Sequence, residues 1–261
     1  MKQDKGIDPE MLTTERIYGP DPGSEEKGIR EHLGRYHFAL GFLKESDVVV
    51  DAACGSGYGS DILAEKAGKV IALDSSDHAI QYARENYPKE NIVFEKADLG
   101  KEVALPDNSV DVVVSFETLE HVLDQDKMLV EFKRILKPSG KLIISTPDRD
   151  ILSGGLESDN PFHLKELNKK EFLSLIGKHF TLEGLYGQGI LTTLPLWKDF
   201  LKKFRKVTLL RKTKQHLMKF LNLERAVHKH FAAEAFTEIT KVSVSGKNSY
   251  YVLVALCLNK K

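Results

Sequence analysis

The sequence predicts an α/β fold built on a largely parallel sheet. Between residues 48 and 146, apolar β-branched segments alternate five times with amphipathic segments, and the first apolar segment ends in an acid and a glycine-rich turn. Such alternation is typical of parallel strands joined by right-handed crossovers. Open sheets of this kind bind ligands at the carboxyl ends of their strands, so the glycine-rich turn marks the expected site.

The glycine-rich turn lies in Val48–Gly59, VVVDAACGSGYG, and precedes a predicted helix over Tyr58–Ala67. Glycines at 55, 57 and 59 remove the Cβ atoms that would block a close approach, and they permit positive φ. A dinucleotide fingerprint instead spaces its glycines G-x-G-x-x-G to seat a pyrophosphate. The alternative interpretation is a glycine turn without a ligand.

The composition is that of a soluble globular chain. Of the 261 residues, 41% are hydrophobic and 29% are charged, with 38 Lys and Arg balancing 38 Asp and Glu. The start of the chain lacks an apolar signal region and no run of 18 apolar residues occurs, so we expect a cytoplasmic protein. Cys54 lies in the turn and Cys257 in an apolar strand, which does not indicate a structural disulfide.

Residues 1–23 are polar and rich in proline, which predicts a flexible N-terminal arm, and residues 24–191 are expected to form the core domain. The core opens with a helix over Ser24–Leu43, which has acids in its first turn. Placed before the first strand, this helix would lie across the ligand site as a lid. Arg35 and Tyr36 then either contact the ligand or are an ordinary solvated Arg and a half-buried Tyr.

Two further acids follow the next strands. The second strand, Lys69–Asp74, ends in an acid about 20 residues beyond the first, where a carboxylate can accept from both hydroxyls of a ribose. A helix over Ser76–Tyr87 and a third strand over Asn91–Glu95 come next. Asp98 follows that strand and either accepts from an adenine amino group or is a solvated turn acid.

The later core elements continue the alternation. Val110–Phe116 is predicted as the fourth strand and Asp124–Leu136 as a helix, which ends at the stop signal Lys137–Gly140. Lys141–Thr146 is predicted as the fifth strand.

The strings VVVDAACGSGYG, IALD, KADL, LPDNSVDVVVSFETLEHV and LKPSGKLIIST, within residues 47–188, resemble the class I S-adenosylmethionine (SAM) methyltransferase family. The resemblance implies a Rossmann-like seven-stranded sheet of order 3-2-1-4-5-7-6 with an antiparallel last strand. Strand six would be Phe180–Gln188 and strand seven Ser249–Leu258. It also implies that the glycine loop wraps the methionine end of SAM while an acid faces its amino group.

Carried onto this sequence, the resemblance implies a set of SAM-binding residues that follow the strand ends and the lid helix. They are Arg35, Tyr36, Asp51, Ala53, Cys54, Gly55, Gly57, Tyr58, Asp74, Ser75, Asp98, Leu99 and Phe116.

A polar cluster follows the fourth strand. Glu117, Glu120 and His121 share one face if the segment is helical, and two carboxylates beside an imidazole repel unless positive charge lies between them. His163 lies in a segment expected at the same sheet edge. The pattern resembles a magnesium-binding subset of the family, which includes ubiquinone-pathway O-methyltransferases and small-RNA terminal 2′-O-methyltransferases. That resemblance implies Mg²⁺ on Glu117, Glu120, His121 and His163, clamping two neighbouring hydroxyls of an acceptor.

Many metal-free relatives also carry a Glu-His pair at this point. The alternative to a metal is therefore a plain general base, or a histidine packed near SAM. In either case His121 is the candidate catalytic base, with Glu117 beside it.

Residues 192–240 are expected to form a basic helical insertion before the final strand in residues 241–261. From 192 to 230, eleven Lys and Arg stand against two acids, with apolar residues interleaved. Three interpretations remain open: a helical cap whose basic face is solvated, a surface for anionic membrane or a phosphorylated acceptor, and an RNA-phosphate site. Nucleic acid is the least favoured, because the aromatic residues resemble core-facing anchors.

The segments HLGRYHFALGFL and NPFHLKEL resemble bacterial methyltransferases associated with surface-polysaccharide synthesis. We therefore expect O-methylation of a hydroxyl on a sugar, sugar-phosphate or glycan intermediate. One alternative is methylation of a quinone precursor or another small aromatic. Another is a non-catalytic SAM-fold binding subunit, which the intact acids Asp51, Asp74 and Asp98 argue against. The oligomeric state stays open.

Overall fold

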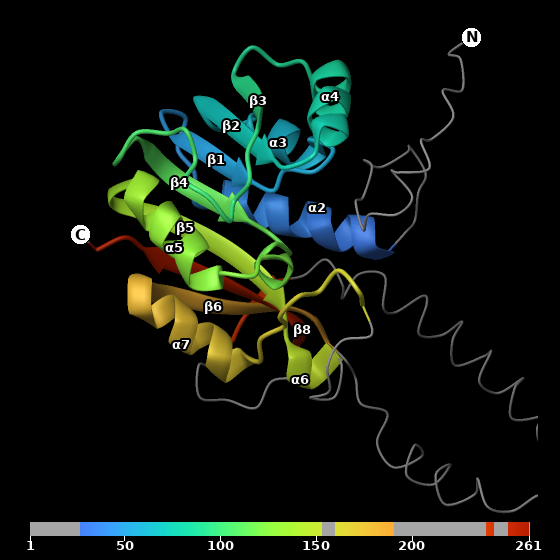
Figure 1. The fold of residues 1–261 in the computed structure, drawn as a ribbon, viewed down its shortest axis with the longest axis vertical. Coiled ribbons are helices and arrows are strands. Elements are labelled where there is room, and N and C mark those ends of the chain that lie inside the picture. Colours follow the sequence, from blue (N-terminus) through green and yellow to red (C-terminus); the bar gives the residue numbers. More distant parts are fainter. Residues whose placement is uncertain (1–26, 153–159, 191–238, 243–249, 261) are drawn as a thin grey trace, which may run out of the picture.

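The computed structural model describes residues 27–152, 160–190, 239–242 and 250–260. They form one mixed eight-stranded sheet of order β3-β2-β1-β4-β5-β8-β6-β7 (Figure 1). The neighbours β1–β5 run parallel, whereas β8 is antiparallel to β5 and β6, and β7 is antiparallel to β6. The strands are β1 (Val48–Ala52), β2 (Lys69–Asp74), β3 (Ile92–Lys96), β4 (Val110–Ser115), β5 (Leu136–Pro147), β6 (Thr181–Ile190), β7 (Ile239–Lys241) and β8 (Tyr250–Leu258).

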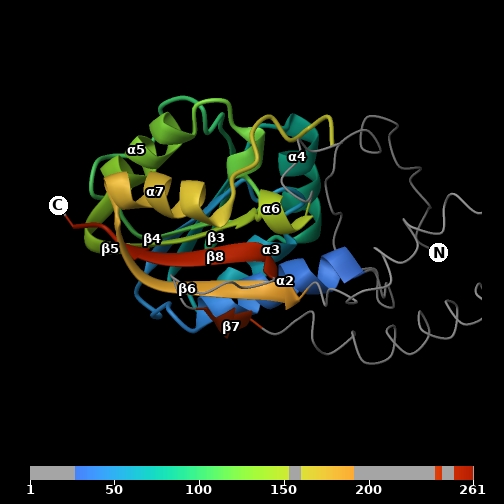
Figure 2. The ribbon, with the colours of Figure 1, turned by 90° about the horizontal axis from the view of Figure 1, so that it is seen from below.

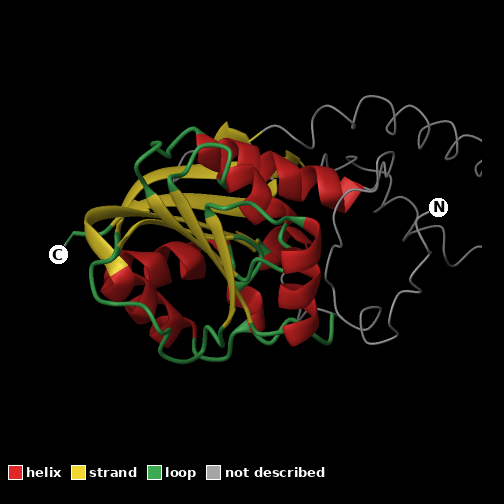
Figure 3. Cartoon of the chain, turned by 90° about the horizontal axis from the view of Figure 1, so that it is seen from above, coloured by secondary structure: helices red, strands yellow, loops and turns green. Residues whose placement is uncertain are grey.

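Helices cover both faces of the sheet (Figure 3). Figure 2 shows α5 and α7 on one face and α2 and α3 on the other, and buried side chains of α4 join the core that contains α2 and α3. The described helices are α2 (Lys27–Leu40), α3 (Tyr58–Leu63), α4 (Asp77–Asn86), η1 (Leu119–His121, a 3₁₀ turn), α5 (Gln125–Ile135), α6 (Arg149–Leu152) and α7 (Lys169–His179).

The apolar strands feed two cores because successive side chains of a strand point to opposite faces. Val49 and Val112 pack into the core beneath α2, α3 and α4, while Val50 and Val113 pack into the core beneath α5 and α7. A central strand covered on both faces reads as a continuous apolar run, as Val48–Val50 does. The predicted α/β class and the core strand order are thereby confirmed.

Several element boundaries differ from the prediction. The described sheet has eight strands where seven were expected, because β7 pairs with β6 at the boundary between the predicted insertion and the final segment. Helix α3 ends at Leu63, not Ala67. The predicted start of the lid helix at Ser24 lies outside the described residues.

The predicted stop signal Lys137–Gly140 lies inside β5. Pairing with β4 jumps from Val110↔Leu136 to Val112↔Lys141, so these residues form an irregularity within the strand. Ser139 adopts φ 63° there, a left-handed conformation typical of a bulge and not of regular strand. The sequence correctly indicates a turn at these residues, but the chain resumes its pairing with β4 directly after it.

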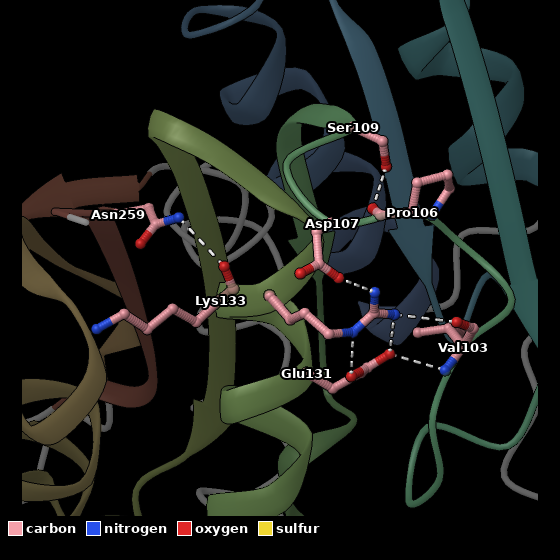
Figure 4. Close-up of polar contacts among 8 residues, drawn as sticks. Val103, Pro106, Asp107, Ser109, Glu131, Lys133 and Asn259 are labelled. Carbon is pink, nitrogen blue, oxygen red and sulfur yellow. Dashed lines mark hydrogen bonds and ion pairs between the residues drawn. The ribbon is translucent and has the colours of Figure 1, made fainter.

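Asn259, near the C-terminus, donates hydrogen bonds to backbone carbonyls at this irregularity. Its buried amide Nδ2 lies 3.0 Å from the Leu136 carbonyl oxygen and 3.2 Å from those of Lys133 and Lys137, and Figure 4 shows it directed at Lys133. These are carbonyls at the end of α5 and the start of β5, where no helical partner is available. The same region carries Arg134, which bonds Glu131 and Asp107.

Two expectations concern residues that the structure leaves out. The flexible arm of residues 1–23 and the basic segment of residues 192–230 both lie outside the described residues. Within the described part of the chain, no helix combines the length and the apolar character needed to cross a bilayer.

We predict that Asn259→Ala lowers the free energy of unfolding by about 1–3 kcal/mol, because it leaves buried carbonyls without a donor. The exposed Asn86 is a matched control, since its Nδ2 also donates to a carbonyl, that of Tyr82, at 2.8 Å. Asn86→Ala should change stability by less than about 0.5 kcal/mol. Urea unfolding followed by circular dichroism gives both values, and equal losses would contradict the assigned role.

Candidate active site

A cavity of about 760 Å³ opens at the carboxyl ends of β1, β2 and β4. Its walls come from the turns after these strands, from α2, and from the segments around Leu123 and Phe162. The catalytic candidates Glu117 and His121 line it, and so do ten of the predicted SAM-binding residues: Tyr36, Ala53, Cys54, Gly55, Tyr58, Asp74, Ser75, Asp98, Leu99 and Phe116.

The three glycines of the turn serve different physical needs. Gly55 has φ 55° and a Cβ there would meet no protein atom within 4 Å, so its bare face is turned to open space. At Gly57, φ is 91° and a Cβ would lie 2.6 Å from the Ala83 Cβ. A Cβ on Gly59 would lie 2.0 Å from the ring of Tyr36. Only Gly55 keeps room for a ligand, while the other two allow close packing.

Asp74 fixes the shape of the turn while it faces the cavity. Its Oδ2 accepts from the Gly55 N–H at 3.0 Å and its Oδ1 from the Ser76 N–H at 2.9 Å. Asp74 therefore couples the turn after β1 to the turn after β2, and both turns line the cavity.

Asp51 lies behind the cavity wall and does not line the cavity. Its side chain is fully buried and accepts from the Tyr36 hydroxyl at 3.1 Å and the Ser60 hydroxyl at 2.6 Å. Burial raises the pKa of Asp51 to about 7, partly offset by these two donors. The Tyr36 ring also meets Tyr58 and Phe116 edge-on, with centroids 5.9 and 5.1 Å apart. Asp51 thus holds the aromatic wall that the ligand would touch.

Arg35 and Gly57 also do not line the cavity. Arg35 is 1% exposed, and its Nη1 donates to Oε1 of Gln188, which ties α2 to β6. The sequence left Arg35 either as a ligand contact on the lid helix or as a solvated residue, and the structure instead buries it away from the cavity lining, because adjacent residues on a helix point in different directions.

Asp98 is half exposed at the rim. Its Oδ1 accepts from the Gly100 N–H at 3.0 Å, and its Oδ2 lies 3.0 Å from Lys101 Nζ. These contacts lower the pKa of Asp98. Leu99 beside it is buried and presents an apolar surface to the cavity.

Glu117 occupies a strained turn after β4, with φ 49°. The Ser145 hydroxyl donates to its Oε1 at 2.6 Å and accepts from its backbone N–H at 3.1 Å. A left-handed non-glycine residue is costly and persists where its surroundings enforce it, often at functional sites. Glu117 faces the cavity, whereas the neighbouring carboxylate Glu120 is 1% exposed and does not line it.

Glu120, His121 and His163 form a compact cluster, each offering one ligand atom within 4.8 Å of the others. Burial, reinforced by the charge of Glu117, raises the pKa of Glu120, whose Oε2 accepts from Thr146 at 3.1 Å. Glu117 is not part of this cluster. The predicted grouping of Glu120 with both histidines is therefore present, but the fourth predicted metal ligand stands apart.

In both histidines of the cluster, the Nδ1 atom is engaged in a hydrogen bond. His121 Nδ1 lies 2.9 Å from the Phe162 carbonyl oxygen, which can only accept, so Nδ1 carries the proton and Nε2 the lone pair. His163 Nδ1 likewise bonds the Glu166 carboxylate, which leaves its Nε2 as the acceptor atom. The two rings meet edge-on with centroids 5.0 Å apart. Such partners fix tautomer and orientation at metal-binding histidines.

Sequence reasoning missed several residues that line the cavity. One is His32, which lies one helical turn before Tyr36, a spacing that would have indicated it. Burial, together with the charge of Arg35, lowers the pKa of His32, so its ring is neutral at pH 7. The others adjoin or lie near predicted site residues in the chain, but their own chemistry did not single them out: Ala97, Gly100, Lys101, Thr118, Val122, Leu123, Asp124, Pro161, Phe162 and Leu164.

Comparison with known proteins agrees with this geometry. Residues 43–224 match the family described as a methyltransferase domain. A "Probable S-adenosylmethionine-dependent methyltransferase" of Mycobacterium tuberculosis is 41% identical over 166 residues, covering 63% of this chain and 59% of that protein. A protein of Mycolicibacterium smegmatis with the same kind of name is 42% identical over 166 residues, which cover 63% of this chain and 63% of that protein. The chain thus spans less than two thirds of these relatives.

Among solved structures, the complex between the Haloferax volcanii Trm112 methyltransferase activator and a methyltransferase contains a chain with a TM-score of 0.62. Identity is 19%, and 92% of this chain and 95% of that chain are covered, which supports the fold alone. Fold and site define a Rossmann-like methyltransferase domain. The chain belongs to the class I SAM-dependent methyltransferase family.

We predict that Asp51 makes stability depend on pH. Because its pKa is raised to about 7 in the folded state, the unfolded chain loses the proton first, and the free energy of unfolding falls as pH rises from about 4 to about 7. Between pH 5 and 7.5 this fall should contribute roughly 2–3 kcal/mol, and Asp51→Asn should abolish that part.

Urea unfolding at the two pH values measures the difference. Asp77→Asn, at an acid whose side chain is 74% exposed, should keep the wild-type pH dependence. If Asp51→Asn also keeps it, the buried carboxyl is not the titrating group.

Proposed function

We propose that the chain is a SAM-dependent methyltransferase that methylates a hydroxyl of a sugar, sugar-phosphate or glycan intermediate. The observation that carries the proposal is the pairing of two features in one cavity. Asp74 and the bare face of Gly55 line the cavity, and so does His121, whose ring is oriented by the Phe162 carbonyl. The first suits a nucleoside and the second suits proton removal from an acceptor.

The residues present fit SAM. The unfilled space at Gly55 admits a ligand against the backbone, Asp74 places a carboxylate on the cavity wall, and Tyr36, Tyr58 and Phe116 provide an aromatic wall. When bound, SAM supplies an electrophilic methyl group on a sulfonium. Alignment of the acceptor oxygen with that group is expected to provide most of the acceleration, because good orientation is worth about 7–11 kcal/mol.

His121 is positioned to take the proton of the acceptor hydroxyl. Its Nδ1 is committed to the Phe162 carbonyl, so Nε2 is the basic atom. General-base assistance of this kind typically contributes roughly 10²–10⁴ in rate. Glu117 lies on the same cavity wall as a second carboxylate acceptor.

The same histidine is also suited to a divalent ion. Glu120, His121 and His163 offer one oxygen and two imidazole nitrogens, a donor set that favours Mn²⁺, Fe²⁺ or Zn²⁺ more than Mg²⁺. A bound ion would lower the pKa of an acceptor hydroxyl. One lone pair cannot serve both ion and proton, so in the metal-bound form Glu117 would accept the proton. The metal-free mechanism leaves that role with His121.

We predict that Asp74→Ala weakens binding of S-adenosylhomocysteine about 10- to 100-fold, because it removes an acceptor for the ribose and loosens the Gly55 turn. Titration calorimetry measures the affinity. Asp77→Ala, three residues away and exposed, should leave it unchanged. No binding by the unmodified protein would overturn the proposed function.

For the metal, we predict that Mn²⁺ restores turnover after treatment with EDTA, and that His163→Ala removes this response. Glu166→Gln should weaken Mn²⁺ binding about 10- to 100-fold, because Glu166 orients the His163 ring. His179→Ala, at a histidine paired with Asp126 between α5 and α7, is the control. Turnover that EDTA does not change would exclude the ion and leave His121 as the base.

A further inference from the structure

The mouth of the cavity is lined by apolar side chains that are unusually exposed. Leu123 is 81% exposed, Leu164 52% and Phe162 44%, and all three line the cavity. Single exposed apolar residues are common on protein surfaces. Three of them gathered at one cavity are not, and a gathered apolar patch marks a site of binding. We call these three residues the apolar rim.

The apolar rim is held in place by the backbone. The Leu164 N–H donates to the Glu120 carbonyl at 2.8 Å, and the Phe162 carbonyl accepts from His121. Buried Gln125 joins the two segments, because its Nε2 donates to the carbonyls of Leu119 and Lys165, each at 2.9 Å. The rim therefore exposes its side chains from a fixed frame that also orients the candidate base.

The charges around the rim do not favour an anion. Asp124 and Glu117 line the cavity beside it. Among the described lining residues the cation is Lys101, and it is paired with Asp98 at 3.0 Å. Phosphate sites normally use Arg, Lys or exposed N–H groups at a helix N-terminus. The N-terminus of α5 follows Leu123 of the apolar rim, and the Asp124 carboxylate already caps it through the Lys127 N–H at 3.0 Å.

We propose that the methyl acceptor is uncharged where it enters the cavity and packs an apolar face on Leu123, Phe162 and Leu164. This rests on the proposed methyltransferase function and narrows it. Neutral glycosides with an aryl or alkyl group meet the requirement, because such groups and the C–H face of a sugar both pack on apolar side chains. Acceptors with a phosphate next to the reacting sugar do not. The positive charge of an ion held by Glu120 would be offset by the negative charges of Glu117 and Asp124.

The test uses matched probes on the full chain saturated with S-adenosylhomocysteine. Octyl glucoside and phenyl glucoside are compared with glucose 6-phosphate and uridine diphosphate glucose, by titration calorimetry and by ligand-observed NMR. We expect the neutral glycosides to bind at least about tenfold more tightly than the phosphorylated probes. Tighter binding of a phosphorylated probe, or no binding of any neutral glycoside, would overturn the proposal.

Variants separate rim contact from general surface effects. Leu123→Lys and Leu164→Lys should each weaken glycoside binding about tenfold, because each removes a leucine contact, and should strengthen binding of glucose 6-phosphate. Val130→Lys, on α5 at a residue that is 53% exposed and does not line the cavity, should change neither. An equal effect of all three substitutions would contradict the rim as the contact surface.

S-adenosylhomocysteine affinity, measured in every variant, keeps the two proposals distinct. Retained affinity with no preference between neutral and phosphorylated probes contradicts the acceptor proposal alone. If the unmodified chain does not bind S-adenosylhomocysteine, the methyltransferase function itself is contradicted.

Discussion

The buried carboxyl group of Asp51 is the contact on which the cavity wall between α2, α3 and β1 depends. Asp51 lies in β1 and accepts hydrogen bonds from Tyr36 on α2 and Ser60 on α3, so one side chain joins three elements. The ring of Tyr36 then lies directly against Gly59, where no Cβ fits. Because the interior is close-packed, this joint fixes how near α2 comes to the strand ends. The width of the cavity follows from that distance.

The wall formed by η1 and the segment around Phe162 is held in a different way, by backbone carbonyls that orient side chains. The segment around Phe162 lies against η1 through the Glu120 carbonyl, which accepts from the N–H groups of Leu164 and Lys165. This docking brings the Phe162 carbonyl to His121 and places His163 beside it. Glu117 has a left-handed backbone, bonds Ser145 and lines the cavity, whereas Glu120 is buried and lies with the two histidines. Two carboxylates that are three residues apart in sequence thereby acquire separate surroundings.

Two parts of the cavity lining differ in polarity. Asp74 and Gly55 present a carboxylate and bare backbone. Leu123, Phe162 and Leu164 present apolar carbons, and the acids Glu117 and Asp124 also belong to the lining. A hydrophobic contact is non-directional, so the apolar part tolerates variation in what packs on it, whereas hydrogen bonds demand one ligand geometry. Under the proposed function, the polar part would take the cofactor and the apolar part the acceptor.

The sequence by itself determined the core of the sheet and the turns after β1 and β2 that line the cavity. Valine runs that end in acids, followed by glycines, are local signals, and they placed Gly55 and Asp74 at the strand ends where the cavity lies. It did not determine the bulge at Ser139, the position of Asp51 and Arg35 outside the cavity lining, or the separation of Glu117 from Glu120. Only the tertiary structure decided these, and it alone brought Leu123 and Phe162 to one cavity, because such arrangements join segments far apart in the chain and depend on which side chain each backbone turn directs inward.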